Sequence, residues 1–168
     1  MALDRDGTLS VLNDLIETCE DGIKGFREAA DAVESREARA VFVKRIELIQ
    51  RSEAELKAEV RRLGGDPEQR GSVSGALHRG WINLKSAITG RDDDAIIAEC
   101  ERGEDVAVKN YKAALEKELP AGIRAIVAQQ YEGTEQNRDK VRALRTSAGG
   151  ASATRSRDPG ERGAPPPA

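Results

Sequence analysis

The sequence predicts an all-α fold, a bundle of four long helices. Apolar residues recur at alternating steps of four and three over long stretches, which is the spacing of an inward helical face. Charged residues make up 34% and aromatic residues 3% of the chain, a composition typical of solvated helices with aliphatic seams. The sequence lacks the strict alternation of a half-buried strand. A length of 168 residues fits one such domain and a tail.

The first helix is expected to begin near Thr8 or Ser10, either of which can cap its N-terminus, and to end near Val33. Its inward face consists of Leu12, Ile16, Cys19, Ile23, Phe26, Ala30 and Val33. Gly22 and Gly25 each weaken the helix by up to about 1 kcal/mol relative to alanine. They indicate either that a neighbouring backbone approaches closely or that the weakness is tolerated.

The second helix follows a tight corner at Glu34–Ser35 and is expected to end at Leu63. Gly64–Gly65 provides a left-handed stop, and Asp66–Pro67 prevents the helix from resuming. Its inward face consists of Phe42, Ile46, Ile49, Glu53, Leu56, Val60 and Leu63, with a glutamate in the central position. So short a corner predicts that the first two helices are antiparallel neighbours.

Residues 64–91 form a long connection that contains a shorter helix, expected at Ser74–Thr89. One face of that helix is apolar and comprises Leu77, Trp81, Leu84 and Ile88. The extended residues and the helix together can span on the order of 50 Å, enough to recross the length of a bundle. This helix-containing crossover permits the third helix to run parallel to the second, which is the ferritin-like arrangement.

The third helix is expected at Asp92–Leu119, because the acidic turn at Asp92–Asp94 can cap it and suits the positive end of the helix dipole. Its inward face comprises Ile97, Cys100, Glu104, Ala107, Tyr111 and Ala114. Pro120 is predicted to open the fourth helix. The inward face of that helix is polar at its centre and comprises Ile123, Val127, Gln130, Thr134, Asn137, Val141 and Leu144.

Residues 1–146 are therefore predicted to form the bundle, and residues 147–168 a disordered tail rich in Gly, Ala, Pro and Arg. The N-terminus is charged and no stretch approaches the ~20 apolar residues of a membrane span, so we expect a cytoplasmic protein with no membrane partner. The net charge of −3 comes from interspersed acids and bases, which argues against a nucleic-acid partner. Cys19 and Cys100 are expected to be buried, reduced thiols.

Polar residues fall near the midpoint of each long helix. Carboxylates that converge from several helices are how bundles bind two iron or manganese ions. One interpretation is therefore a di-metal site, with Tyr111 as a hydrogen-bonding neighbour. Its metal ligands would be Glu20, Glu53, Glu101, Glu104 and Gln130.

The spacing also argues against a metal site. Such sites usually take Glu-x-x-His from each of two helices, but Leu56 lies three residues after Glu53, and the fourth helix has no histidine. The alternative is a partly hydrated polar layer that fixes the register of the helices, in which Glu53 pairs with Lys57. Glu104 would then bond across the core to Gln130, Thr134 or Asn137. On this interpretation no cofactor is needed, and ferroxidase-type activity is not expected.

His78 is the only histidine and lies beside the apolar face of the connecting helix. It is expected to bond to a nearby backbone carbonyl. A role as an extra ligand or an acid–base group requires that the connecting helix lie over the middle of the bundle.

Several short motifs carry a family likeness over about residues 9–145. They are Leu63-Gly64-Gly65, Gly71-Ser72, His78-Arg79-Gly80-Trp81, Leu84-Lys85, and Cys100-Glu101-Arg102-Gly103-Glu104-Asp105 with Tyr111. With these motifs the chain resembles a bacterial ferritin-like four-helix-bundle family known chiefly as a domain of unknown function. The resemblance implies the ferritin-like topology and assigns no catalytic residue.

Three functional hypotheses follow. The first is a ferritin-like bundle without enzymatic activity that self-associates as a homo-oligomer and serves a stress-related or housekeeping role. The second is a di-iron or manganese carboxylate protein that binds or oxidises metal. The third is an interaction module that presents its charged faces or its tail to a partner.

Overall fold

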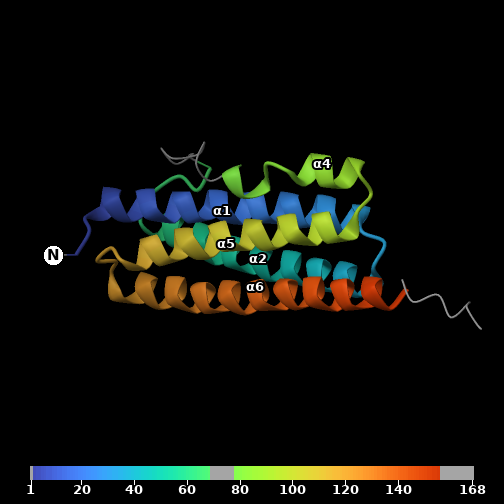
Figure 1. Cartoon of the computed structure of the whole chain (residues 1–168). Helices are drawn as coiled ribbons and strands as arrows, with labels where there is room; N and C mark the ends of the chain where they lie inside the picture. The colour runs from blue at the N-terminus through green and yellow to red at the C-terminus, as the bar shows by residue number, and fades with distance from the viewer. Residues whose placement is uncertain (1, 69–77, 156–168) are drawn as a thin grey trace, which may run out of the picture.

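The computed structural model describes residues 2–68 and 78–155. Four long helices lie side by side in an elongated bundle, with two short helical elements along one side (Figure 1). The described residues contain no strand, so the predicted all-α bundle is confirmed. The elements in chain order are α1 (Arg5–Ala32), α2 (Arg36–Arg62), η1 (His78–Trp81), α4 (Leu84–Thr89), α5 (Asp93–Leu115) and α6 (Ala121–Arg155).

The directions of the helices are those of the predicted topology. In Figure 1, α1 and α6 run from left to right, whereas α2 and α5 run from right to left. The segment between α2 and α5 returns along the bundle, and its elements η1 and α4 pack on α1 and α5. Because of this crossover α5 runs parallel to α2, as a ferritin-like bundle requires.

Two helix ends differ from the predictions. The first helix begins before Thr8 and Ser10, because the side chain of Asp4 caps it by accepting a hydrogen bond of 2.7 Å from the Gly7 amide. Thr8 lies inside the first turn and is buried. The third helix, α5, was expected to reach Leu119 but ends at Leu115. The chain turns there, ahead of the proline that precedes α6.

The remaining helix signals are confirmed. The Ser35 side chain caps α2 by accepting a hydrogen bond from the Ala38 amide. Gly64 follows α2 with a φ of 76°, the left-handed conformation that favours glycine. Asp92 caps α5, and α6 begins at Ala121 directly after the proline.

The core contains most of the apolar residues predicted to face inward, whereas Ile23, Ile46 and Leu63 are only partly buried. Phe26 and Phe42 pack across the α1–α2 interface with ring centroids 5.5 Å apart. Cys19 and Cys100 are buried free thiols, as expected. Side chains with at most 2% exposure include Leu12, Leu15, Ile16, Leu56, Val60, Ile96, Ile97, Ile123 and Val127.

The crossover is fixed to the bundle by Trp81. The indole lies where a Cβ atom on Gly25 of α1 or on Gly103 of α5 would overlap it, so both positions need glycine. The ring also packs edge-on against Phe26, with centroids 5.2 Å apart. The sequence predicts one helix over Ser74–Thr89, but η1 and α4 are separate, since the chain bends to insert the indole between α1 and α5. The part of that prediction before residue 78 lies outside the described residues.

The last helix continues further than predicted. The α6 backbone reaches Arg155, although the bundle is expected to end at residue 146. The predicted tail after residue 155 lies outside the described residues. None of the helices in the described part of the chain combines the length and the hydropathy needed to cross a bilayer.

Candidate functional site

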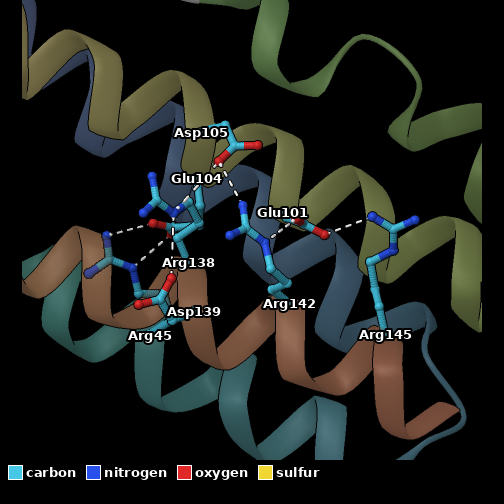
Figure 2. Close-up of polar contacts among 8 residues, drawn as sticks. All are labelled: Arg45, Glu101, Glu104, Asp105, Arg138, Asp139, Arg142 and Arg145. Atoms are coloured by element: carbon cyan, nitrogen blue, oxygen red, sulfur yellow. Dashed lines mark hydrogen bonds and ion pairs between the residues drawn. The ribbon is translucent and has the colours of Figure 1, made fainter.

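The centre of the bundle holds a buried ion pair between α2 and α5. Glu104 of α5 is only 2% exposed, the lowest exposure of any acid among the described residues. The Arg45 guanidinium of α2 binds it with two bonds, from Nε to Oε1 at 2.8 Å and from Nη2 to Oε2 at 3.2 Å (Figure 2). Arg45 Nη2 also donates to Thr134 Oγ1 of α6 at 3.3 Å. The pair therefore links three helices at mid-bundle.

Burial and charge pairing act on Glu104 in opposite directions. Burial raises the pKa of Glu104 above its ordinary value, because the charged form loses its hydration. Attraction to Arg45 and the hydrogen bonds from it lower the pKa, but the pKa stays raised. The partner of Glu104 is therefore Arg45, and not Gln130, Thr134 or Asn137 as predicted. The guanidinium thus supplies the compensation that a carboxylate in an apolar core needs.

Further buried polar side chains belong to the same central group as this pair. Tyr111 Oη donates to Gln130 Oε1 at 2.9 Å and lies 3.5 Å from Cys19 Sγ. Gln130 Nε2 in turn donates to the Ser52 carbonyl at 3.2 Å. Burial raises the pKa of Cys19 to about 12 and that of Tyr111 well above its ordinary value, so both groups carry their protons at neutral pH.

Two of the predicted ligands meet at a lysine. Lys57 Nζ lies 3.0 Å from Glu53 Oε1 and 3.8 Å from Glu20 Oε1. The predicted pairing of Glu53 with Lys57 is confirmed. The Glu53 hydrogen bond raises the pKa of Lys57, which keeps the ammonium charged. These half-buried side chains lie toward the edge of the α1–α2 interface.

Glu101 belongs to a third group, at the α5–α6 interface. Its carboxylate accepts hydrogen bonds from Arg142 Nε and from Arg145 Nη1, each at 2.8 Å (Figure 2). Burial by itself raises the pKa of Glu101, but the bonds from Arg145 and Arg142 outweigh it, and the pKa is lowered. Glu101 is therefore held ionised by arginines of α6.

The five predicted ligands do not fit a di-metal site. The structure divides them among three groups, and the glutamates in each group already pair with a cationic side chain. Over residues 2–68 and 78–155, no three His, Cys, Asp or Glu side chains are grouped so that they could hold a metal ion. A guanidinium at the central position also repels a metal cation. We derive no metal-dependent step from this arrangement. The His78 side chain lies outside what the structure describes.

The comparisons with known proteins agree with the fold. A profile of the protein family described as "Domain of unknown function (DUF2383)" matches residues 7–117. The chain belongs to this family. No curated protein matches it. A solved structure from Anabaena variabilis, a two-domain protein containing DJ-1/ThiJ/PfpI-like and ferritin-like domains, is similar with a TM-score of 0.72 at 14% sequence identity. The match covers 99% of this chain and 42% of that one, so the likeness concerns the ferritin-like fold alone.

Within this member of the family, Arg45 is the residue that the sequence does not single out. The neighbouring Ile46 fits the same four–three spacing and is apolar, so the predicted inward face passes through it. The observed face passes one residue earlier and leaves Ile46 half-buried. Its buried members on α2 are Ala38, Phe42, Arg45, Ile49, Leu56 and Val60. The signal in the sequence that favours Arg45 over Ile46 as the inward residue is the need of a buried Glu104 for a cationic partner.

A small cavity adjoins the ion pair. Its volume is about 20 Å³, enough for about one water molecule. Arg45, Glu104, Tyr111 and Thr134 line its inner part, and Trp81 of the crossover lines it as well.

Proposed function

We propose that the chain is a non-catalytic ferritin-like protein in which an arginine, and not a metal ion, neutralises the central carboxylate. One observation supports this: Arg45 binds both oxygens of Glu104, the most buried acid of the described residues. A bidentate guanidinium satisfies a carboxylate in a geometry that leaves little capacity for a metal. A cytoplasmic, stress-related or housekeeping role is the sequence-based expectation that accompanies this proposal.

Metal content and ferrous-ion oxidation test the proposal. The protein is purified anaerobically from cells supplied with iron and manganese, and metal is measured by mass spectrometry. We expect far less than one metal ion per chain and no ferrous oxidation above that of buffer. The double variant Glu53→Ala/Glu104→Ala should behave in the same way.

Stoichiometric iron or manganese that is lost in the double variant would overturn the proposal and favour the di-metal hypothesis. The control is Glu47→Ala, which removes an exposed glutamate of α2. Metal lost equally from this control would indicate adventitious surface binding. The metal-binding hypothesis, the interaction-module hypothesis and homo-oligomerisation all stay predictions.

A further inference from the structure

A second, larger cavity lies between α1 and the crossover, away from the central ion pair. Its volume is about 350 Å³, within the size range of small-molecule sites. Figure 1 shows α4 lying along the C-terminal half of α1. The side chains that line the cavity are Asp21, Lys24 and Glu28 from α1, and Trp81, Leu84 and Lys85 from the crossover.

The lining combines one apolar wall with charges of both signs. Trp81 forms most of the accessible apolar part, because Leu84 is only 3% exposed and is largely covered by the bundle. Lys24 and Lys85 are cationic, one on each side of the cavity. Glu28 lies one helical turn after Lys24 on the same face of α1 and, with a second carboxylate from that helix, balances the lysines.

This balance selects among ligands. A purely anionic ligand would be attracted by the lysines and repelled by the carboxylates, and a purely cationic ligand would meet the reverse. A ligand with separate positive and negative ends can satisfy both sets at once. An apolar substituent on such a ligand would gain by covering the accessible part of the indole.

The apolar wall is already in its final position. Trp81 is held by close contact with two backbones, at Gly25 and Gly103, and by its edge-on contact with Phe26. A wall that does not need to be ordered on binding loses less conformational entropy, so the ligand can be small.

We propose that this cavity binds a small zwitterion of the α-amino-acid type. Its carboxylate lies between Lys24 and Lys85, its ammonium group faces Glu28, and its apolar side chain covers Trp81. Arg45 and Glu104 do not line this cavity, although it shares Asp21 and Trp81 with the small cavity beside them. The proposal does not rest on the proposed non-catalytic role.

The only tryptophan of the chain is Trp81, so its fluorescence reports binding directly. The full-length protein is titrated with three probes that share a branched aliphatic end: L-leucine, 4-methylpentanoate, which lacks the ammonium group, and 3-methylbutylamine, which lacks the carboxylate. We expect a saturable change with leucine and, for each of the other probes, an affinity weaker by about tenfold or more. No saturable change at millimolar leucine, or equal affinities for the three probes, would overturn the proposal.

Variants assign the two ends of the ligand. Lys85→Ala should abolish the preference for leucine over the amine, and Glu28→Ala the preference over the carboxylate. Both side chains are exposed, so circular dichroism melts should match those of the wild type. The control is Lys44→Ala, an exposed lysine of α2 outside the cavity, which should bind leucine normally. Unaltered preferences in both cavity variants would refute the assignment.

Discussion

Replacing Arg45 by methionine is the sharpest test of the central ion pair. Methionine preserves much of the side-chain length but leaves the Glu104 carboxylate buried without a cation. The two bonds from Arg45 to Glu104 are charge-assisted, and at about 1.5–3 kcal/mol each they sum to about 3–6 kcal/mol. Breaking one half of a buried ion pair costs about 3–5 kcal/mol, in agreement with that sum.

A loss of that size is large for a protein of this kind, because domains unfold with a free energy of only about 5–15 kcal/mol. Urea unfolding followed by circular dichroism would measure it as a shift in midpoint at unchanged slope. The double variant Arg45→Met/Glu104→Met removes both charges, and we expect it to recover most of the loss, since an apolar pair needs no compensation.

The exposed pair of Lys44 and Glu47 provides the control. Its atoms lie 3.4 Å apart, but both side chains are more than half exposed. The variant Lys44→Met should change stability by less than about 0.5 kcal/mol. A loss below about 1 kcal/mol for Arg45→Met, or no recovery in the double variant, would refute the reasoning that Glu104 depends on Arg45.

Three further predictions follow. The arginines lower the pKa of Glu101 from 4.5, so ionised Glu101 stabilises the folded protein above pH 4.5. This stabilisation is lost as the pH falls through the folded-state pKa. Glu101→Gln should therefore flatten the acid side of a curve of unfolding free energy against pH. Gly103→Ala should destabilise the protein by about 1–3 kcal/mol and red-shift the fluorescence of the displaced Trp81. Cys19, with its pKa at about 12, should react with a thiol reagent at pH 8 only after the protein is denatured.

Each of these has an outcome that would contradict it. If the acid side of the stability–pH curve is the same in Glu101→Gln as in the wild type, the arginines do not lower the pKa of Glu101. For Gly103→Ala the control is Gly122→Ala, where nothing lies within 4 Å of the added methyl group, and equal stabilities in the two variants would contradict the close fit of Trp81. Fast labelling of Cys19 in the native protein would mean that the core opens readily.

The fold was predictable from the sequence because its signals are local and repeated. The four–three spacing fixes each helix, and Gly64 and Asp92 mark the ends of elements without reference to the rest of the chain. The predicted start of α1 at Thr8 or Ser10 was wrong, because Asp4 can cap a helix equally well and only the contacts of the folded chain decide among such residues.

The candidate site was predictable only in part, because it depends on which residues meet across helices. The burial of Glu104 and Gln130 follows from the spacing, and the pair of Glu53 with Lys57 follows from their separation of one turn. The partner of Glu104 does not follow from the spacing. Arg45 is 59 positions away in the sequence, and the apolar pattern assigns the inward position to its neighbour Ile46.

That separation has a consequence for assembly of the chain. Arg45 belongs to the hairpin of α1 and α2, and Glu104 to the hairpin of α5 and α6, so each hairpin alone carries an unmatched charge on the surface that the other hairpin covers. Docking in a shifted register would bury both charges apart from each other, which is strongly unfavourable. The two hairpins can therefore pack closely in only one register, and the ion pair selects that register against the others.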